Sequence, residues 1–412
     1  MLPKTPAKGM RDFLPKEFAL RQQVLNTIQK TYETFGFTRI ETPAVEKLSL
    51  LTSKQGGDNE KLIFKILKRG EKLGNADGEL CDLGLRYDLT VPLARFYSCN
   101  NANLPSVFKA IQMDNVWRAD RPQRGRFRQF VQCDIDIIGE ESNLAETELI
   151  LATTTALKNL GFSDVNVRIS DRRLLNALAE FCGFEEEQKS AVFIALDKLD
   201  KIGLDGVKKE IDEISAEKSE KFIRFLQSVT ESQSPFETCV ELLGDFLPQN
   251  VKQNLQDLIF VCNQCISNGK VVFDVTLVRG MGYYTGTIYE IAVDGLNLSV
   301  GGGGRYDKMI GKITGNDVPA CGFSIGFERI VLLLQERGVT CGNLNGAAVL
   351  VEKNIDAAQL LQVEKACATL RERCKVTVVR KIKNLGYQLK QLKENGFEQI
   401  LEFKNGELKE LN

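Results

Sequence analysis

The fold is decided by residues 115–139, which read NVWRADRPQRGRFRQFVQCDIDIIG. Strand-like runs open and close this stretch, and Pro122 and Gly125 break the charged loop between them, which predicts a hairpin. In the second strand the period of two separates an apolar face from a polar face. The apolar face carries Val131, Cys133, Ile135 and Ile137, and the polar face carries Arg126, Arg128, Gln132, Asp134 and Asp136.

The charges of this stretch are separated along the chain. Five arginines fall within eleven residues, at positions 118, 121, 124, 126 and 128, and two aspartates follow. Guanidinium groups bind phosphate oxygens in pairs, and a recessed carboxylate selects a hydrogen-bond donor. The pattern therefore indicates a ligand with phosphate at one end and a cationic or donor group at the other. A hairpin with a solvated, arginine-rich tip would explain it equally well.

The composition is that of a globular protein. The 412 residues are enough for two or three domains, with 43% hydrophobic and 26% charged residues. No apolar run is long enough for a membrane span and the start has no signal-peptide pattern, so we expect a cytoplasmic chain without a membrane partner. Because the net charge is −1, a nucleic-acid site would have to be a local patch.

The cysteine and histidine counts exclude several chemistries. Eleven cysteines without an export signal predict thiols and not a disulfide framework. Cys262 and Cys265 form a lone CxxC with no second pair, so we predict no metal site. The chain contains no histidine, which excludes a histidine general base, Ser-His and Cys-His pairs and imidazole ligation of a metal.

Helical and strand patterns divide the rest of the chain. Apolar spacing predicts helices at about 17–35 and 142–159, a strand at 37–41, and a helical insertion over 171–268. A short linker at 339–346 precedes an alternation of strands and helices over 347–412, which predicts an α/β unit.

The hairpin resembles motif 2 of class II aminoacyl-tRNA synthetases in the form found in histidyl-tRNA synthetases. Arg118 precedes Arg-Pro-Gln at 121–123 by three residues, and Gly-Arg-Phe-Arg-Gln-Phe follows at 125–130. Further strings resemble the same family: KGMRDFLP at 8–15 with the helix and strand after it (motif 1), RYDLTVPLAR at 86–95, VRGMGYYTG at 278–286, GGRYD at 303–307, and GFER at 326–329 (motif 3).

The resemblance implies an α+β fold with a class II antiparallel-sheet catalytic core at 1–170 and 269–338. It further implies a helical insertion domain at 171–268, the linker at 339–346 and a shortened anticodon-binding-like α/β domain at 347–412. The implied activity is histidine–tRNA ligase: ATP, with Mg²⁺, activates L-histidine to histidyl-adenylate, and the acyl group moves to the 3′ end of tRNA(His). Motif 1 implies a homodimer.

The resemblance also implies roles for individual residues. The catalytic cations are Arg118 and Arg279. Histidine is bound by Asp88, Leu89, Thr90, Gln132, Asp136, Tyr283 and Tyr284. ATP is bound by Arg118, Arg126, Arg279 and Arg329, and the acceptor end of tRNA by Arg121 and Gln123. An aspartate at a helix start, such as Asp88, is also a common helix cap. The sequence departs from the family pattern at Gly282, where a polar residue is more usual.

Two other functions fit parts of the sequence. A catalytically silent paralogue that senses histidine, as a regulatory subunit in histidine biosynthesis, would share the core. Arg118, Arg121 and Arg329 favour the enzyme, whereas the shortened C-terminal domain favours the paralogue. A synthetase-like nucleic-acid binder without catalysis is opposed by the neutral net charge.

The zero histidine count generates a prediction about the chain's own synthesis. A ligase without histidine would not consume its own product when it is translated, so we expect its expression to persist under histidine starvation. The measurement compares the expression level of this chain with that of histidine-containing proteins in cells starved of histidine. A decline in step with those proteins would refute the hypothesis.

Overall fold

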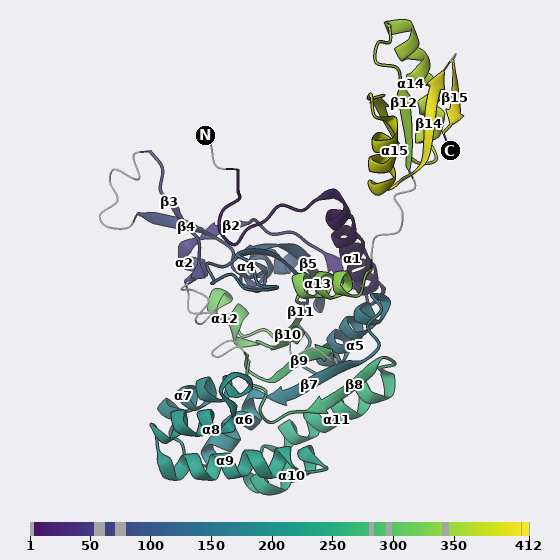
Figure 1. Ribbon diagram of the computed structural model, residues 1–412. Coiled ribbons are helices and arrows are strands. Elements are labelled where there is room, and N and C mark those ends of the chain that lie inside the picture. Colours follow the sequence, from purple (N-terminus) through teal and green to yellow (C-terminus); the bar gives the residue numbers. More distant parts are fainter. Residues whose placement is uncertain are drawn as a thin grey trace. The chain divides into compact units, whose positions relative to one another are not determined.

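The computed structural model describes residues 4–52, 62–70, 80–279, 284–293, 299–339, 346–404 and 406–411 (Figure 1). The chain divides into two compact units. Unit 1 comprises Met1–Asp12 and Val24–Leu333, and unit 2 comprises Phe13–Gln23 and Leu334–Asn412.

An eight-stranded sheet forms the centre of unit 1. In spatial order its strands are β1 (Thr38–Arg39), β5 (Phe108–Trp117), β6 (Gln129–Ile138), β11 (Ala320–Ile325), β10 (Ser299–Arg305), β9 (Thr287–Val293), β7 (Val165–Asp171) and β8 (Gly269–Phe273). The two outermost pairs are parallel and the inner pairs are antiparallel. This antiparallel-rich sheet is the architecture that the α+β prediction requires.

The predicted hairpin is the pair β5 and β6. The two strands pair from Phe108 opposite Ile138 to Trp117 opposite Gln129, so the first strand begins earlier than the quoted stretch. The strand expected at 37–41 is shorter in the structure, because β1 pairs with β5 only at Thr38 and Arg39.

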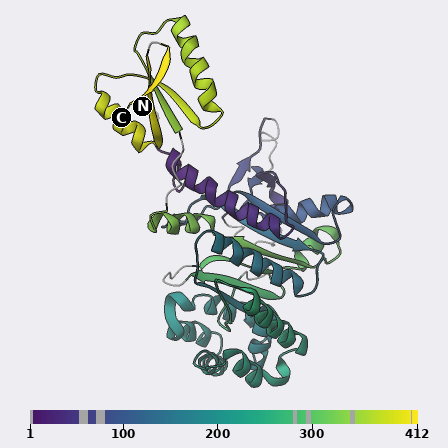
Figure 2. The ribbon, with the colours of Figure 1, turned by 90° about the vertical axis from the view of Figure 1, so that its right-hand side faces the viewer.

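Further helical elements precede, connect and follow these strands in the sequence. They are α1 (Pro15–Thr34), α2 (Leu48–Leu51), α4 (Thr90–Asn100), the 3₁₀ turn η2 (Asn101–Asn103), α5 (Leu144–Asn159), α12 (Lys308–Thr314) and α13 (Phe327–Glu336). Helix α5 packs across β6, β11 and β7, as Figure 2 shows. Glu146 of α5 accepts a hydrogen bond from Arg305 Nε at 2.7 Å, which identifies the face of β10 that α5 covers. A second, three-stranded sheet has the strand order β2 (Val45–Lys47), β4 (Cys81–Leu85) and β3 (Lys65–Leu67).

The stretch between β7 and β8 is helical, as its periodicity predicts (Figure 1). It contains α6 (Arg172–Phe181), α7 (Glu186–Leu196), α8 (Leu199–Asp212), α9 (Ala216–Thr230), α10 (Pro235–Leu243), η3 (Gly244–Phe246) and α11 (Gln249–Cys265). Asp171 ends β7 and caps α6, accepting a hydrogen bond from the backbone N–H of Arg173 at 2.8 Å. This cap turns the chain from the sheet into the helices.

Unit 2 contains the alternation of strands and helices predicted for 347–412. Its elements are β12 (Gly346–Val351), α14 (Ala357–Arg371), β13 (Lys375–Arg380), α15 (Leu385–Glu394), β14 (Phe397–Lys404) and β15 (Glu407–Glu410). Alternate residues of β12 face opposite helices: Val349 packs with α14 and Leu350 with α15. Within the described ranges, no helix of the chain is both long and apolar enough to cross a membrane.

The glycine run at 301–304 is a strand in the middle of the large sheet. A glycine run alone is more typical of a turn, but here β10 pairs on both sides, with β9 and with β11. A Cβ atom added at Gly303 would lie 1.9 Å from the carbonyl oxygen of Gly322 on the neighbouring strand. Glycine is therefore required for the two backbones to approach this closely.

This contact predicts a loss of stability in Gly303→Ala. Because the added methyl group meets backbone, the strands must move apart, and overpacking of this kind costs about 1–3 kcal/mol or more. We expect a lower midpoint of thermal unfolding. Gly301→Ala in the same strand is the matched control: its Cβ would lie 3.0 Å from the nearest atom and its loss should be smaller. Equal midpoints for Gly303→Ala and the parent chain would show that glycine is not required at position 303 for the strands to pair.

Candidate active site

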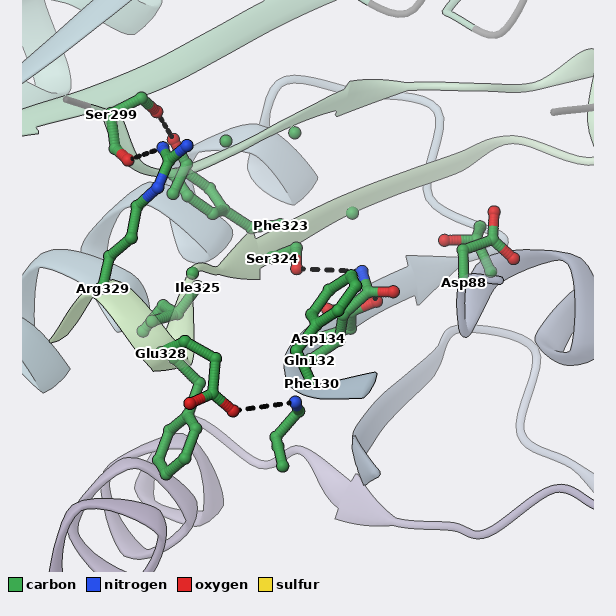
Figure 3. Close-up of a pocket in the computed structure, with 18 of the residues that line it drawn as sticks. Asp88, Phe130, Gln132, Asp134, Ser299, Phe323, Ser324, Ile325, Glu328 and Arg329 are labelled. Atoms are coloured by element: carbon green, nitrogen blue, oxygen red, sulfur yellow. Dashed lines mark hydrogen bonds between the residues drawn. The ribbon is translucent and has the colours of Figure 1, made fainter. Parts of the chain in front are cut away.

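A pocket of about 400 Å³ lies on the face of the large sheet that points away from α5 (Figure 3). Strands β6, β10 and β11 form its floor, and the starts of α4 and α13 and the loop after β5 form its sides. It brings together nine of the predicted site residues: Asp88, Thr90, Arg118, Arg126, Gln132, Asp136, Arg279, Tyr284 and Arg329.

Three of the predicted residues that the structure describes do not line this pocket. The side chain of Leu89 is buried, and its backbone carbonyl accepts a hydrogen bond from Gln112 Nε2 at 2.9 Å. Arg121 and Gln123 are exposed on the loop between β5 and β6. Tyr283, together with Gly282, lies outside the described residues.

Three buried carboxyl groups contribute to the pocket. Asp88 at the start of α4 accepts a hydrogen bond from the backbone N–H of Val91 at 3.1 Å, so it is both a helix cap and a pocket residue. Burial raises the pKa of Asp88 to about 6, although the hydrogen bond from Val91 favours the ionised carboxylate and so lowers the pKa. Burial likewise raises the pKa of Asp136 to about 7, although Tyr306 Oη donates to its Oδ1 at 2.5 Å. Burial and the neighbouring Asp136 raise the pKa of Asp134 well above its usual value.

The polar face of β6 presents oxygen atoms to the pocket. Gln132 Nε2 donates to Asp134 Oδ2 and to Ser324 Oγ, both at 3.3 Å, which orients the amide. Gln132 Oε1, Asp134 Oδ1 and Asp136 Oδ2 are buried and have no hydrogen-bond partner among the described residues. A buried acceptor without a partner is costly. This part of the pocket therefore fits a ligand that carries N–H donors or a positive charge.

Arginines gather at the other side of the pocket. Figure 3 shows Arg329 and Asp88 on opposite sides, with Gln132 and Asp134 between them. Arg329 donates to the carbonyl of Ser299, and burial together with the positive charges of Arg126 and Arg279 lowers its pKa. Cations held this close to one another indicate an anion-binding site.

Two further arginines are held by backbone and ring contacts. Arg118 Nε donates to the carbonyl of Tyr87 at 2.8 Å, and its guanidinium lies 5.3 Å from the centre of the Phe130 ring. Arg279 lies against β10, where a Cβ on Gly302 would lie 1.7 Å from its Nη1. The glycine strand thus accommodates the Arg279 side chain.

Several pocket residues were absent from the predicted set. They include Asp134, Ser324, Tyr306 and Glu328. The period of two placed Asp134 on the polar face of β6 with Gln132 and Asp136, but no ligand role was predicted for it. Tyr306 belongs to the GGRYD string, but its hydrogen bond to Asp136 depends on tertiary structure. Ser324 faces Asp134 only through the register of β11 with β6.

The raised pKa of Asp88 predicts that Asp88→Asn stabilises the ligand-free protein. A rise from 3.8 to about 6 corresponds to about 3 kcal/mol of stability lost once the carboxyl is ionised. The cost is absent below pH 3.8 and complete above pH 6, so the variant's advantage should be largest at pH 8 and shrink towards pH 4. An asparagine oxygen can still accept from Val91.

The measurement is the midpoint of thermal unfolding of the variant and the parent from pH 4 to pH 8. The control is Asp205→Asn, which removes an exposed carboxylate from α8 and should shift the midpoint little at any pH. A midpoint for Asp88→Asn that does not exceed the parent's at pH 8 would show that the buried charge is not costly.

The chain is similar to known proteins over most of its length. A family model described as histidyl-tRNA synthetase matches residues 9–330. The chain is 44% identical to a histidine–tRNA ligase of Leifsonia xyli subsp. xyli, over 96% of this chain and 94% of that protein. It is 38% identical to a histidine–tRNA ligase of Christiangramia forsetii, over 89% and 84% respectively.

Solved structures show the same fold. The crystal structure of histidyl-tRNA synthetase from Nostoc sp. PCC 7120 matches with a TM-score of 0.79 and 27% identity, over 100% of this chain and 97% of that one. A structure described as an ATP phosphoribosyltransferase regulatory subunit/histidyl-tRNA synthetase, from Bacillus halodurans C, has a TM-score of 0.78 at 20% identity over 98% of each chain, and shares the fold. The predictions of a class II fold and of an aminoacyl-tRNA ligase are confirmed, and the chain belongs to the histidyl-tRNA synthetase family.

Proposed function

We propose that the pocket binds L-histidine and ATP side by side, joins them as histidyl-adenylate and passes the acyl group to the 3′ end of tRNA(His). The observation that carries this proposal is the separation of charge in one pocket. Buried oxygen acceptors on β6 suit the ammonium and imidazole groups of histidine, and the arginines suit a triphosphate.

The acidic part of the pocket is proposed to hold histidine. Asp88 and Thr90 would bind the α-ammonium group, because both line the pocket at the start of α4. Gln132 and Asp136 would accept hydrogen bonds from the amino acid through oxygens that have no partner in the described structure. Burial raises the pKa of Tyr284 to about 12, so its phenol stays neutral and can pack against the imidazole, together with Tyr283.

The arginines are proposed to hold ATP. A carboxylate oxygen of histidine attacks the α-phosphorus, the bond from this phosphorus to the bridging oxygen breaks, and pyrophosphate leaves with the electron pair. Arg118 and Arg279 would stabilise the charge that develops on the α-phosphate. Arg126 and Arg329 would bind the outer phosphates. The attacking carboxylate is already ionised, so this step needs no general base.

Magnesium is proposed to arrive with the nucleotide. Among the described residues, no group of three or more aspartate, glutamate or cysteine side chains could hold a metal ion. Mg²⁺ in such sites takes most of its ligands from phosphate oxygens and water. The ion would therefore bind as part of the substrate, Mg·ATP, and the chain would contribute the arginines around it.

The second step is proposed to use the exposed loop. Arg121 and Gln123 would face the acceptor end of tRNA while a ribose hydroxyl attacks the acyl carbon. The phosphate accepts the proton and AMP leaves. We further propose a homodimer formed through motif 1 and a cytoplasmic location. The proposed domains are the catalytic core (1–170 and 269–338), the helical insertion (171–268), the linker (339–346) and an anticodon-binding-like domain (347–412).

The test is histidine-dependent exchange of pyrophosphate into ATP by the purified chain, compared with Arg279→Ala. We expect exchange that requires histidine and Mg²⁺, and a loss of about 100-fold or more in the variant, because one donor to the developing charge is removed. The matched control is Arg224→Ala on α9, an exposed arginine whose ion pair is with Glu220. It should exchange like the parent.

The alternative has a different signature. A histidine-sensing regulatory paralogue would bind histidine, with a shift in the midpoint of thermal unfolding, but would show no exchange. If Arg279→Ala still exchanges pyrophosphate like the parent, the chain has adenylation activity but Arg279 does not contribute to it.

A further inference from the structure

Arg279 is anchored by a carboxylate outside the set of predicted site residues. Its Nη1 lies 2.9 Å from Glu290 Oε2 on β9 and 3.3 Å from the carbonyl oxygen of Gly301, to which it donates. Glu290 pairs across the sheet with Gly302, the glycine against which the guanidinium lies. The side chain of Arg279 is therefore fixed in position by strands β9 and β10.

Glu290 is itself shared between two arginines. Arg168 Nη1 donates to its second oxygen, Oε1, at 3.3 Å, and Arg168 pairs with Glu290 in the register of β7 with β9. One carboxylate thus faces a cation on each side. Arg168 therefore competes with Arg279 for the carboxylate of Glu290, so that Arg279 is not the sole partner of this negative charge.

Arg168 is braced from a third strand. Its Nε donates to Asp274 Oδ2 at 2.5 Å, directly after β8. The other oxygen of Asp274 accepts from the backbone N–H and the hydroxyl of Thr276, at 2.8 and 2.6 Å. The side chains of Arg168, Glu290 and Asp274 are only about one-fifth exposed (23%, 18% and 20%), so water screens these ion pairs less than surface pairs.

We propose that Glu290 is a positioning residue for Arg279, and that Arg168, braced by Asp274, sets the charge that Glu290 presents. This inference rests on the proposed role of Arg279 in adenylation. Without the carboxylate, the long Arg279 side chain would sample other rotamers, and the acids elsewhere in the pocket would compete for it. An error of about 1 Å in the placement of such a group can cost about 100-fold in rate.

The first experiment is a double-mutant cycle of Glu290→Gln and Arg279→Ala in the pyrophosphate exchange assay. Glutamine keeps the shape of the side chain and an acceptor oxygen but loses the charge. We expect kcat to fall roughly 10- to 100-fold in Glu290→Gln, with the KM for histidine unchanged. In the Arg279→Ala background, measured at raised enzyme concentration, Glu290→Gln should cause less than about a twofold further loss.

The second experiment tests the charge of Arg168. In Arg168→Met, Glu290 should pair with Arg279 alone, and we expect the KM for ATP to rise by about tenfold. Arg168→Lys keeps the positive charge, so its KM for ATP should stay within about threefold of the parent value. Glu46→Gln is the control, because it breaks a partly buried Arg–Glu ion pair of 2.6 Å with Arg95, outside the pocket. It should leave both kinetic constants unchanged even if the thermal midpoint falls.

The outcomes separate this inference from the proposed function. If Arg279→Ala loses exchange while Glu290→Gln keeps the parent kcat, or if the two losses multiply in the double variant, Glu290 does not act through Arg279 and the inference fails alone. If Arg279→Ala keeps full exchange, the proposed role of Arg279 fails first.

Discussion

The site depends on glycines in the central strands of the large sheet, at the positions where charged side chains lie against the backbone. A Cβ on Gly322 would lie 2.0 Å from Asp136 Oδ1, and one on Gly302 would lie 1.7 Å from Arg279 Nη1. Both the acidic and the cationic parts of the pocket therefore rest on bare backbone. Glycine weakens a strand because it adds conformational entropy to the unfolded chain. Here the neighbouring strands on both sides of β10 compensate, since they pair with it along most of its length.

Opposite charges in one small pocket would neutralise each other if they were free to meet. The structure prevents this by giving each group a local partner of its own. Asp136 is held by the hydroxyl of Tyr306, Asp88 by a backbone N–H, and Arg279 by Glu290. The charge of Arg118 favours the ionised forms of Asp88 and Asp134, although burial of these carboxyl groups has the larger effect on their pKa values. The pocket is thus preorganised for a ligand that carries both signs of charge, which lowers the reorganisation required when charge moves in the reaction.

The sequence predicted the parts of this arrangement that depend on local pattern. The period of two separated the faces of β6, and nine of the residues taken from the family-like strings line one pocket. The sequence could not predict contacts that depend on strand register. Ser324 orients Gln132 because β11 pairs with β6 at one register, and Glu290 reaches Arg279 because β9 lies beside β10. A glycine run that is typical of a turn became a central strand for the same reason, since the pairing partners are distant in the sequence.

The absence of histidine from the chain makes the buried aspartates more consequential. Histidine is the side chain whose ordinary pKa lies near neutrality. In this chain, burial moves the pKa of Asp88 to about 6 and that of Asp136 to about 7, so two carboxyl groups titrate in that range instead. Each carboxyl group is ionised above its pKa and neutral below it. A bound ammonium or imidazolium group would lower both pKa values again, because it stabilises the ionised form. Burial therefore makes the two carboxylates costly without a charged partner, and a positively charged group of a ligand would offset part of that cost.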